Sequence, residues 1–214
     1  MSHADAITLF HAPQTRSSGV LTLLEELGAP YELHALNMKA GEHLEPAYRA
    51  INPMAKVPAI LHRGALVTEQ VAIYIYLADL FPQADLTPAL DDARRGPYLR
   101  WLVFYAACYE PALVDRSMQR EPGPRAMCPY GDFDTMLGAL TTQLSAHPYL
   151  LGEAPTAADV LWGNALRWGM MFKVVPETPL LTTYVERMTS RPAVRRAGEI
   201  DAELIAAREA SSIG

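Results

Sequence analysis

Strand-type and helix-type patterns of apolar residues both occur before Pro82, but only helix-type patterns occur after it, and this difference restricts the folds that the chain can adopt. Before Pro82, short runs rich in β-forming residues alternate with helical patterns, whereas every pattern beyond it has helical spacing. A chain of 214 residues is long enough for two small domains, each with its own core. We therefore expect a small α/β domain followed by an all-helical domain.

The first part divides into two supersecondary units. The first is β-α-β, whose two strands should be parallel because such crossovers are right-handed. The second is β-β-α, with Arg63-Gly64 as a tight hairpin turn between its strands. Together they describe a thioredoxin-like domain, whereas the polar residues 37–52 indicate no clear element. The expected elements, in order, are strand 7–11, a helix carrying residues 20–27, strand 31–36, strands 57–61 and 65–67, and a helix over 69–81.

The second part contains apolar stripes at helical spacing and no strand pattern. We expect a thioredoxin-like domain over residues 1–82, a linker over 83–92, which is poor in periodicity, and an all-helical domain over 93–214. Thr156-Ala157-Ala158-Asp159 has the form of a capping box before one of the stripes, and we assign it a structural role.

Charge and composition argue against several classes of partner. The formal net charge is −6 with an isoelectric point near 5.5, and both halves are acidic, so we expect no nucleic-acid partner. No apolar run approaches the ~18 residues of a membrane span. The start of the chain, residues 1–6, lacks the basic and apolar regions of a signal peptide. We therefore expect a cytoplasmic protein that does not enter the membrane.

The cysteines and histidines indicate neither a dithiol centre nor a metal site. Cys108 and Cys128 do not form Cys-x-x-Cys, which excludes a thioredoxin-type dithiol, and a structural disulfide between them is the less favoured alternative. The 6 histidines are scattered without the spacing of metal ligands, so we assign no metal.

Four stretches of the sequence resemble the cytosolic glutathione transferases, bacterial ones in particular. The resemblance covers nearly the whole chain, with Ala55 in place of the usual glycine and Gln70 in place of the usual serine. It implies glutathione transferase architecture, an enzyme of detoxification that uses glutathione as co-substrate, and a homodimer. The stretches are Ala12-Pro13-Gln14-Thr15-Arg16-Ser17 leading into residues 20–28, Ile51-Asn52-Pro53-Met54-Ala55-Lys56-Val57-Pro58, Thr68-Glu69-Gln70-Val71-Ala72-Ile73, and Leu151-Gly152-Glu153-Ala154-Pro155-Thr156-Ala157-Ala158-Asp159.

The same resemblance implies which residues bind glutathione. A cis peptide between Val57 and Pro58 would present the Val57 backbone to the cysteinyl unit, as in strand addition. Glu69 would face the ammonium of the γ-glutamyl group and Gln70 its carboxylate, at a helix N-terminus that favours anions. Lys39 and Lys56 would reach the glycine carboxylate. The alternatives are a trans proline at a strand edge, a helix-end acid and two solvated lysines.

The thiol of glutathione needs a donor or a positive charge to ionise near neutral pH. The family places a Tyr, Ser or Cys after its first strand, where this chain offers Thr15, Arg16 and Ser17. Counting back without gaps from Leu24-Glu25-Glu26, the resemblance places Arg16 opposite the cysteine of beta-class enzymes and Ser17 just after it. We rank Ser17 first as the hydroxyl donor, with Arg16 as a cationic stabiliser and Thr15 next. The alternative for Ser17 is a helix N-cap.

A hydrophobic electrophile would bind along the first helix after the linker, which lines this pocket in the family. The side chains assigned to the pocket are Trp101, Tyr105, Cys108, Tyr109 and Arg116. The alternative for each aromatic residue is packing in the protein interior.

The sequence does not distinguish among three glutathione-dependent reactions: conjugation, peroxide reduction and cis-trans isomerisation. A non-catalytic binding or regulatory protein on the same fold is the main rival. A thiol reductase is weakened because no cysteine lies near the first turn.

Overall fold

The computed structural model of the chain describes residues 6–211. Residues 1–5, on which the expectation of a missing signal peptide partly rests, lie outside the described residues. Two compact units are present. The first unit comprises the described residues up to Ala84 together with the C-terminal segment from Pro192, and the second runs from Asp85 to Arg191. No helix within residues 6–211 is both long and apolar enough to span a bilayer.

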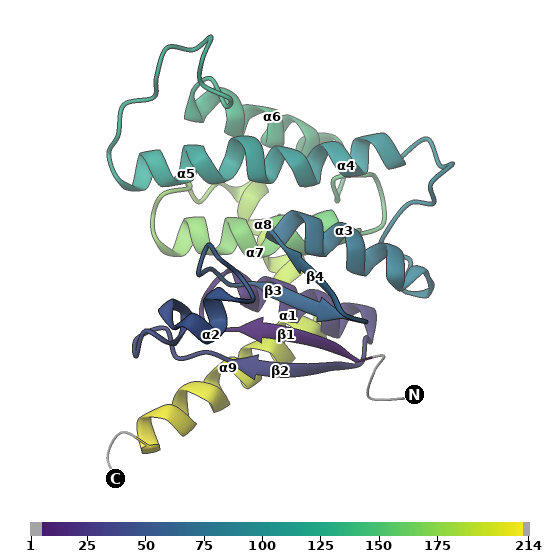
Figure 1. Cartoon of the computed structure of the whole chain (residues 1–214). Helices are drawn as coiled ribbons and strands as arrows, with labels where there is room; N and C mark the ends of the chain where they lie inside the picture. The colour runs from purple at the N-terminus through teal and green to yellow at the C-terminus, as the bar shows by residue number, and fades with distance from the viewer. Residues whose placement is uncertain (1–5, 212–214) are drawn as a thin grey trace. The chain divides into compact units, whose positions relative to one another are not determined.

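The first unit is built on a four-stranded mixed sheet with strand order β2-β1-β3-β4 (Figure 1). β1 pairs with β2 in parallel and with β3 in antiparallel fashion, and β3 pairs antiparallel with β4. This is the predicted sequence of β-α-β and β-β-α units. The strands are β1 (Ile7–His11), β2 (Tyr31–Ala35), β3 (Ala59–His62) and β4 (Ala65–Thr68).

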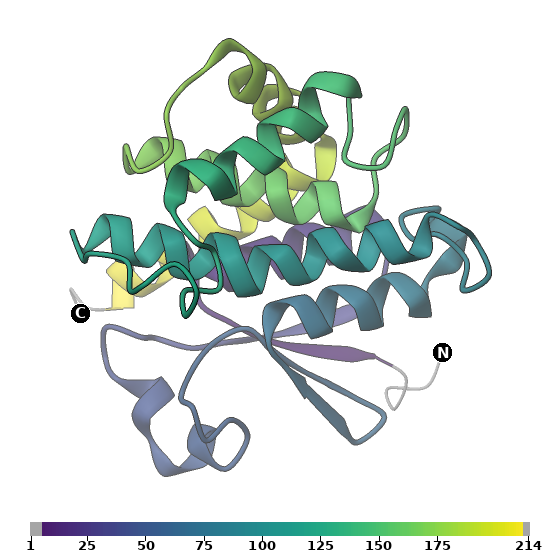
Figure 2. The same ribbon diagram turned by 90° about the horizontal axis from the view of Figure 1, so that it is seen from above.

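Helices cover both faces of this sheet. Phe10 packs against Tyr48 of α2 (Pro46–Arg49) with ring centroids 5.7 Å apart, so α2 covers one face. Leu9 points to the opposite face because side chains alternate along a strand. That face is covered by α1 (Arg16–Leu27) and α3 (Gln70–Leu80), as Figure 2 shows. The segment 37–52, which the sequence left unassigned, contains α2 and the short 3-10 helix η2 (Glu42–Leu44).

Local sequence signals explain where these elements begin and end. Thr15 is the N-cap of α1, and its hydroxyl accepts from the backbone N–H of Ser17. Gly28 ends the helix with a φ of 59°, the left-handed conformation that favours glycine at this position. The β3–β4 hairpin turns at Arg63 and Gly64, whose φ angles of 50° and 78° fit a two-residue hairpin.

The last helix, α9 (Pro192–Ser211), belongs to the first unit and packs against α1. Arg208 donates to the carbonyl oxygen of Leu36 over 2.9 Å, which ties the helix to the end of β2. The structure thus differs from the predicted division, in which residues 93–214 form one helical domain. The helical spacing of this segment was readable in the sequence, but the unit it joins depends on contacts between distant residues.

The second unit is entirely helical within its described residues. A short 3-10 helix, η3 (Pro82–Ala84), precedes it and overlaps the start of the predicted linker over 83–92. A π-helical turn joins α4 and α5 just before Pro111, whose ring lacks an N–H and cannot continue a regular α-helix. The elements are α4 (Arg95–Phe104), η4 (Tyr105–Tyr109), α5 (Glu110–Ser117), α6 (Phe133–Ala146), α7 (Ala157–Met171) and α8 (Pro179–Thr189).

The predicted capping box at the start of α7 is confirmed. Asp159 Oδ2 accepts from the backbone N–H of Thr156 over 2.8 Å, and the Thr156 side chain bonds the backbone at Asp159 in return. Asp159 is fully buried and also accepts from the backbone N–H of Leu150 over 2.8 Å. One carboxylate therefore fixes both the helix start and the loop before it.

Candidate functional site

The sheet register brings three chain segments together at one end of the strands of the first unit, which we call the sheet edge. Ala59 pairs with Phe10 of β1 on one side and with Thr68 of β4 on the other. The residues just after β1, just before β3 and just after β4 therefore meet at the same edge. These segments contain every predicted glutathione-binding residue except Lys39, which follows β2.

The segment before β3 contains the cis peptide between Val57 and Pro58 that the sequence predicted. Two side chains hold the backbone just ahead of it. The Tyr48 hydroxyl donates to the Lys56 carbonyl oxygen over 2.6 Å, and the Asn52 amide donates to the same oxygen over 2.9 Å. Burial raises the pKa of Tyr48 to about 12, so its hydroxyl remains a donor at neutral pH. Within residues 6–211, the N–H and the carbonyl of Val57 make no hydrogen bond.

Ala55 occupies the position where the family pattern has glycine, and its φ of 53° explains that preference. An L-residue in the left-handed region costs roughly 1–2 kcal/mol, which glycine does not incur. The Ala55 side chain is buried, and its N–H donates to the Asn52 carbonyl oxygen over 2.9 Å. Ala55 therefore holds the tight turn at a conformational cost that glycine would not incur.

The segment after β4 enters α3 through Glu69, which has the unusual backbone angles φ 64° and ψ 115°. A non-glycine residue held in such a conformation is typical of functional sites, because the surrounding fold must enforce it. Glu69 is exposed and makes no side-chain cap to the helix. The first N–H groups of α3 therefore open onto the same edge as Val57.

Gln70 connects this helix start to the turn after β1. Its Nε2 donates to the carbonyl oxygen of Arg16 over 3.1 Å. Glycine at position 19 leaves room for this approach, because a Cβ there would lie 2.9 Å from that nitrogen. Tyr74, one turn further along α3, donates to the Gly19 carbonyl oxygen over 2.6 Å. α3 and the first turn of α1 are thus locked together.

The three candidates for the thiolate group differ in exposure. Arg16 is exposed and Thr15 is partly exposed, whereas Ser17 has no exposed surface. The Ser17 hydroxyl lies 2.9 Å from Nδ1 of His11 and accepts from the backbone N–H of Ala12 over 3.0 Å. It therefore faces the protein interior, and Thr15 takes the N-cap role that the sequence offered to Ser17. The burial of Ser17 argues against its first rank as the donor.

Lys39 and Lys56 are both exposed, on the segment after β2 and on the turn before β3. Their side chains form no ion pair within the described residues, and both remain predicted contacts for a ligand carboxylate.

Three of the five predicted pocket residues lie in the core of the second unit instead. Trp101, Tyr105 and Tyr109 are each less than 5 % exposed and surround the ring of Trp162, with centroids 6.0, 5.8 and 5.0 Å away. The Tyr109 hydroxyl donates to the Ala165 carbonyl oxygen over 3.1 Å. Their i, i+4 spacing identifies a shared face, but that face is the interior one.

The other two predicted pocket residues are more accessible. Cys108 is partly exposed, and its Sγ lies 3.4 Å from the Pro129 carbonyl oxygen. Burial raises the pKa of the Cys108 thiol, with a smaller effect from Cys128. Both cysteines are free thiols. Arg116 is half exposed, with its guanidinium carbon 4.1 Å from the ring centroid of Phe133.

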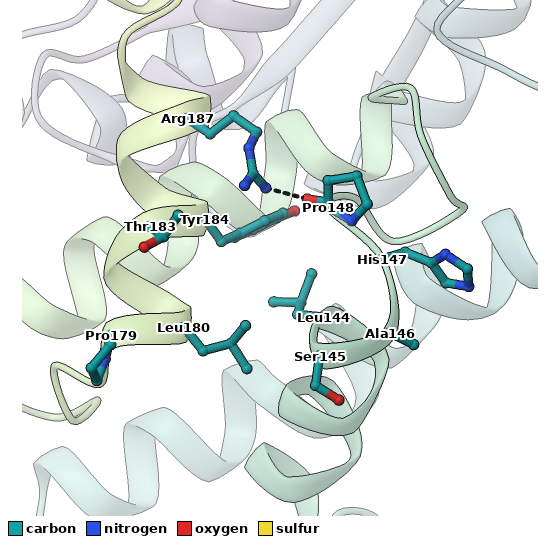
Figure 3. Close-up of a pocket in the computed structure, with 10 residues that line it drawn as sticks. All are labelled: Leu144, Ser145, Ala146, His147, Pro148, Pro179, Leu180, Thr183, Tyr184 and Arg187. Atoms are coloured by element: carbon teal, nitrogen blue, oxygen red, sulfur yellow. Dashed lines mark hydrogen bonds between the residues drawn. The ribbon is translucent and has the colours of Figure 1, made fainter.

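The second unit also has a cavity of about 550 Å³ between the end of α6 and α8. Figure 3 shows Leu144 and Leu180 pointing into it from the two helices, with Tyr184 across the back. The guanidinium of Arg187 bonds the Pro148 carbonyl oxygen at its rim. None of the residues that the sequence predicted for the site lines this cavity.

Sequence reasoning gave no role to several residues that shape the candidate site. Asn52 lies within a quoted motif, so its position could have suggested a structural role. Tyr48 lies in the unassigned segment 37–52. Asp201 of α9, whose carboxylate contacts the turn after β1, has no sequence signal because its contact depends on the tertiary fold.

Comparison with known proteins places the chain in a family. Residues 5–79 match the family model "Glutathione S-transferase, N-terminal domain", and residues 132–192 match "Glutathione S-transferase, C-terminal domain". The chain belongs to the glutathione S-transferase family, as the four motifs predicted. Its fold is the thioredoxin-like domain with a helical partner domain that defines this architecture.

Curated relatives cover most of the chain. A GST-like protein of Streptococcus mutans is 31% identical over 208 residues, covering 87% of this chain and 78% of the relative. Glutathione S-transferase GstA of Escherichia coli O157:H7 is 28% identical over 88% of this chain and 96% of its own length. The disulfide-bond oxidoreductase YfcG of Escherichia coli is 26% identical over 89% of this chain and 94% of its own length.

Solved structures of glutathione transferases have the same fold as this chain. A glutathione transferase of Methylococcus capsulatus superposes with a TM-score of 0.77 at 27% identity, covering 92% of this chain and 99% of that structure. A glutathione transferase homologue from Sulfitobacter, with bound glutathione, gives a TM-score of 0.72 at 26% identity, covering 91% and 97%.

Proposed function

We propose that the chain binds glutathione at the sheet edge of its first unit and activates the thiol for attack on a small hydrophobic electrophile. The observation that carries the proposal is the convergence at one edge of the unpaired Val57 backbone, the open N-terminus of α3 at Glu69, and the first turn of α1. Family membership and the bound glutathione in the Sulfitobacter homologue support it.

Each part of the tripeptide has a matching group at that edge. The cysteinyl unit pairs with the N–H and carbonyl of Val57 as a short added strand. The γ-glutamyl carboxylate binds at the positive N-terminus of α3 together with the Gln70 amide, and the ammonium of the same group pairs with the carboxylate of Glu69. The glycine carboxylate takes Lys56 or Lys39. Binding is divided among several weak contacts, so no single variant should abolish it.

Activation of the thiol depends on the turn after β1. Ionisation of a thiol with a pKa near ~8.5 is favoured by nearby donors and positive charge. Because Ser17 is buried, we propose the Thr15 hydroxyl and the Arg16 guanidinium as the groups that stabilise the sulfur. The Thr15 hydroxyl donates to the Ala12 carbonyl oxygen over 2.8 Å in this structure, and it would turn its proton to the sulfur when glutathione binds. The enzyme then contributes positioning and electrostatic stabilisation rather than covalent chemistry. A homodimer and a cytoplasmic location remain predictions from the family resemblance.

The kinetics of conjugation test this proposal. With glutathione and an aryl halide, Thr15→Ser should retain turnover, whereas Thr15→Val and Arg16→Met should each lower kcat with little change in the KM for glutathione. Ser17→Ala separates support from direct contact: this buried hydroxyl lies 2.7 Å from the Thr15 hydroxyl oxygen and does not touch the sulfur, so its loss should lower kcat less than Thr15→Val does. Glutathione binding without turnover on any electrophile, peroxide or isomerisable substrate would instead support a non-catalytic binding protein.

A thiol reductase is the second candidate, because YfcG is named a disulfide-bond oxidoreductase. The two cysteines of this chain lie in its second unit, and the raised pKa of Cys108 makes that thiol less reactive at neutral pH. A reductase would therefore have to work through the glutathione thiol itself. Reduction of a small disulfide that persists in a Cys108→Ala, Cys128→Ala double variant would favour this candidate.

A further inference from the structure

Asp201 of α9 reaches the turn that follows β1 and uses both carboxylate oxygens there. Oδ2 accepts from the backbone N–H of Gln14 over 2.9 Å and from the Ser18 hydroxyl over 2.6 Å. Oδ1 lies 2.9 Å from Nε2 of His11. Asp201 is 8 % exposed, and Gln14 precedes it by 187 positions in the chain.

His11 lies between Asp201 and the start of α1. Its ring is fully buried, and its Nδ1 lies 2.9 Å from the Ser17 hydroxyl oxygen. A carboxylate beside Nε2 favours the tautomer that carries its proton there, which leaves Nδ1 to accept from Ser17. The Ser17 oxygen in turn lies 2.7 Å from the Thr15 hydroxyl oxygen. Polar atoms within 2.9 Å of one another thus lead from Asp201 through His11 and Ser17 to Thr15.

This chain of contacts resembles a hydrolase triad in composition but is not built as one. The Ser17 hydroxyl has no exposed surface, so no substrate carbonyl can reach it. It also lies 3.0 Å from both the N–H and the carbonyl oxygen of Ala12, two further partners within the turn. What the network does is fix the backbone and the hydroxyl groups of residues 12–18.

The carboxylate is suited to that role because it stays ionised. Burial alone would raise the pKa of Asp201, but the contacts with His11, Ser18 and the Gln14 N–H outweigh it and lower the pKa. An ionised acceptor makes stronger hydrogen bonds than a neutral one, by about a factor of two. The turn is therefore held by charge-assisted bonds from an element outside the β-α-β unit.

We propose that Asp201 is a positioning residue for the thiolate site: acting directly on Gln14 and Ser18, and through His11 and Ser17, it holds Thr15 and Arg16 where they stabilise the glutathione sulfur. This inference rests on the proposed function and adds to it a residue of the C-terminal helix. Asp201 touches neither glutathione nor the electrophile. Its removal should change thiol activation while leaving the contacts at Val57 and Glu69 intact.

The test compares Asp201→Asn with Glu203→Gln in the full-length protein. The asparagine keeps the size and one acceptor oxygen but removes the charge, and Glu203 is an exposed acid on the same helix. Three quantities are measured: the calorimetric Kd for glutathione, the pKa of the bound thiol from its ultraviolet thiolate absorbance, and kcat with an aryl halide. Ser18→Ala, which removes one bond to Asp201, provides a second and milder variant should Asp201→Asn fail to fold.

For Asp201→Asn we expect a raised pKa of the bound thiol and a kcat lower by about tenfold to a hundredfold, the cost of misplacing a catalytic group. The Kd for glutathione should stay within about threefold, because misplacement of the turn leaves the binding contacts in place. Ser18→Ala should change the same two quantities by less, and Glu203→Gln should match the wild type.

Two results would overturn the inference alone, given a wild-type protein that binds and turns over glutathione. In the first, Asp201→Asn keeps the wild-type thiol pKa and kcat, with Ser18→Ala used in its place if Asp201→Asn does not fold. In the second, the variant loses affinity for glutathione in parallel with kcat. A wild-type protein that fails to bind glutathione overturns the proposed function and this inference with it.

Discussion

Tyr184 of α8 donates its hydroxyl hydrogen bond to Oδ1 of Asp159 over 2.9 Å, in the interior of the second unit. Burial raises the pKa of Tyr184 well above its usual value, so the hydroxyl keeps its proton and remains a donor. The same carboxylate caps α7 and holds the N–H of Leu150. One acid thus joins two helices and a loop.

We predict that Asp159→Ala lowers the free energy of unfolding far more than Tyr184→Phe. The phenylalanine removes one hydrogen bond, worth about 1 kcal/mol. The alanine leaves the buried N–H groups of Leu150 and Thr156 unpaired, at roughly 1–3 kcal/mol each. Urea denaturation measures both values, and equal losses for the two variants would contradict this account of the capping site.

Close packing at Gly169 predicts a strongly destabilising substitution on α7. A Cβ there would lie 2.5 Å from Val175 Cγ2 and 2.8 Å from the Tyr109 hydroxyl oxygen, so Gly169→Ala should cost about 1–3 kcal/mol. Gly138 on α6 is the matched control, because a Cβ there meets nothing within 4 Å. Gly138→Ala should stabilise by up to about 1 kcal/mol. Thermal denaturation should give opposite signs, and a shared sign would refute the packing argument.

The left-handed turn at Ala55 predicts a substitution that stabilises the protein. Ala55→Gly relieves a cost of roughly 1–2 kcal/mol, less about 0.5–1 kcal/mol of added chain entropy, for a net gain of about 0–1.5 kcal/mol. Ala50 has a right-handed backbone with φ −67°, so Ala50→Gly should destabilise. The two sites differ in the sign of φ and also in burial, because Ala55 is buried whereas Ala50 is exposed. A loss of stability in both, by denaturant titration, would show that Ala55 is not strained.

The lowered pKa of Asp201 predicts a loss of stability in acid. The unfolded chain binds the proton more tightly than the folded one, so the stabilisation is complete above the unfolded pKa near 3.8 and is lost as pH falls through the lower folded value. Asp201→Asn should flatten this acid limb, whereas Glu203→Gln should preserve its shape. Unfolding measured across this pH range checks the prediction, and an unchanged limb in Asp201→Asn would contradict it.

Local sequence signals predicted the features that depend on neighbouring residues. The β-α-β and β-β-α units, the cis peptide before Pro58, the C-terminal Gly28 of α1 and the capping box at Thr156 are all present. Each is set by turn chemistry, capping or periodicity, with family resemblance supplying the cis peptide. The π-helical turn at 105–109 was not predicted, although Pro111 was visible as its cause.

Features that depend on which face of an element is buried were not predictable in the same way. Helical spacing places Tyr105 and Tyr109 on one face but does not say whether that face meets a ligand or the core. Ser17 and Thr15 are two residues apart, and the phase of the helix start decided which hydroxyl turned inward. The contact of Asp201 with Gln14 joins distant parts of the chain, so no local pattern indicates it.

The central claim, that glutathione binds at the sheet edge of the first unit, is tested most directly by a heteronuclear NMR titration of the isotope-labelled protein. The account predicts saturable shifts, up to millimolar glutathione, that cluster on the backbone amides of Thr15, Val57, Gln70 and Val71. Saturable shifts confined to the second unit, or no shifts in a folded sample, would contradict it.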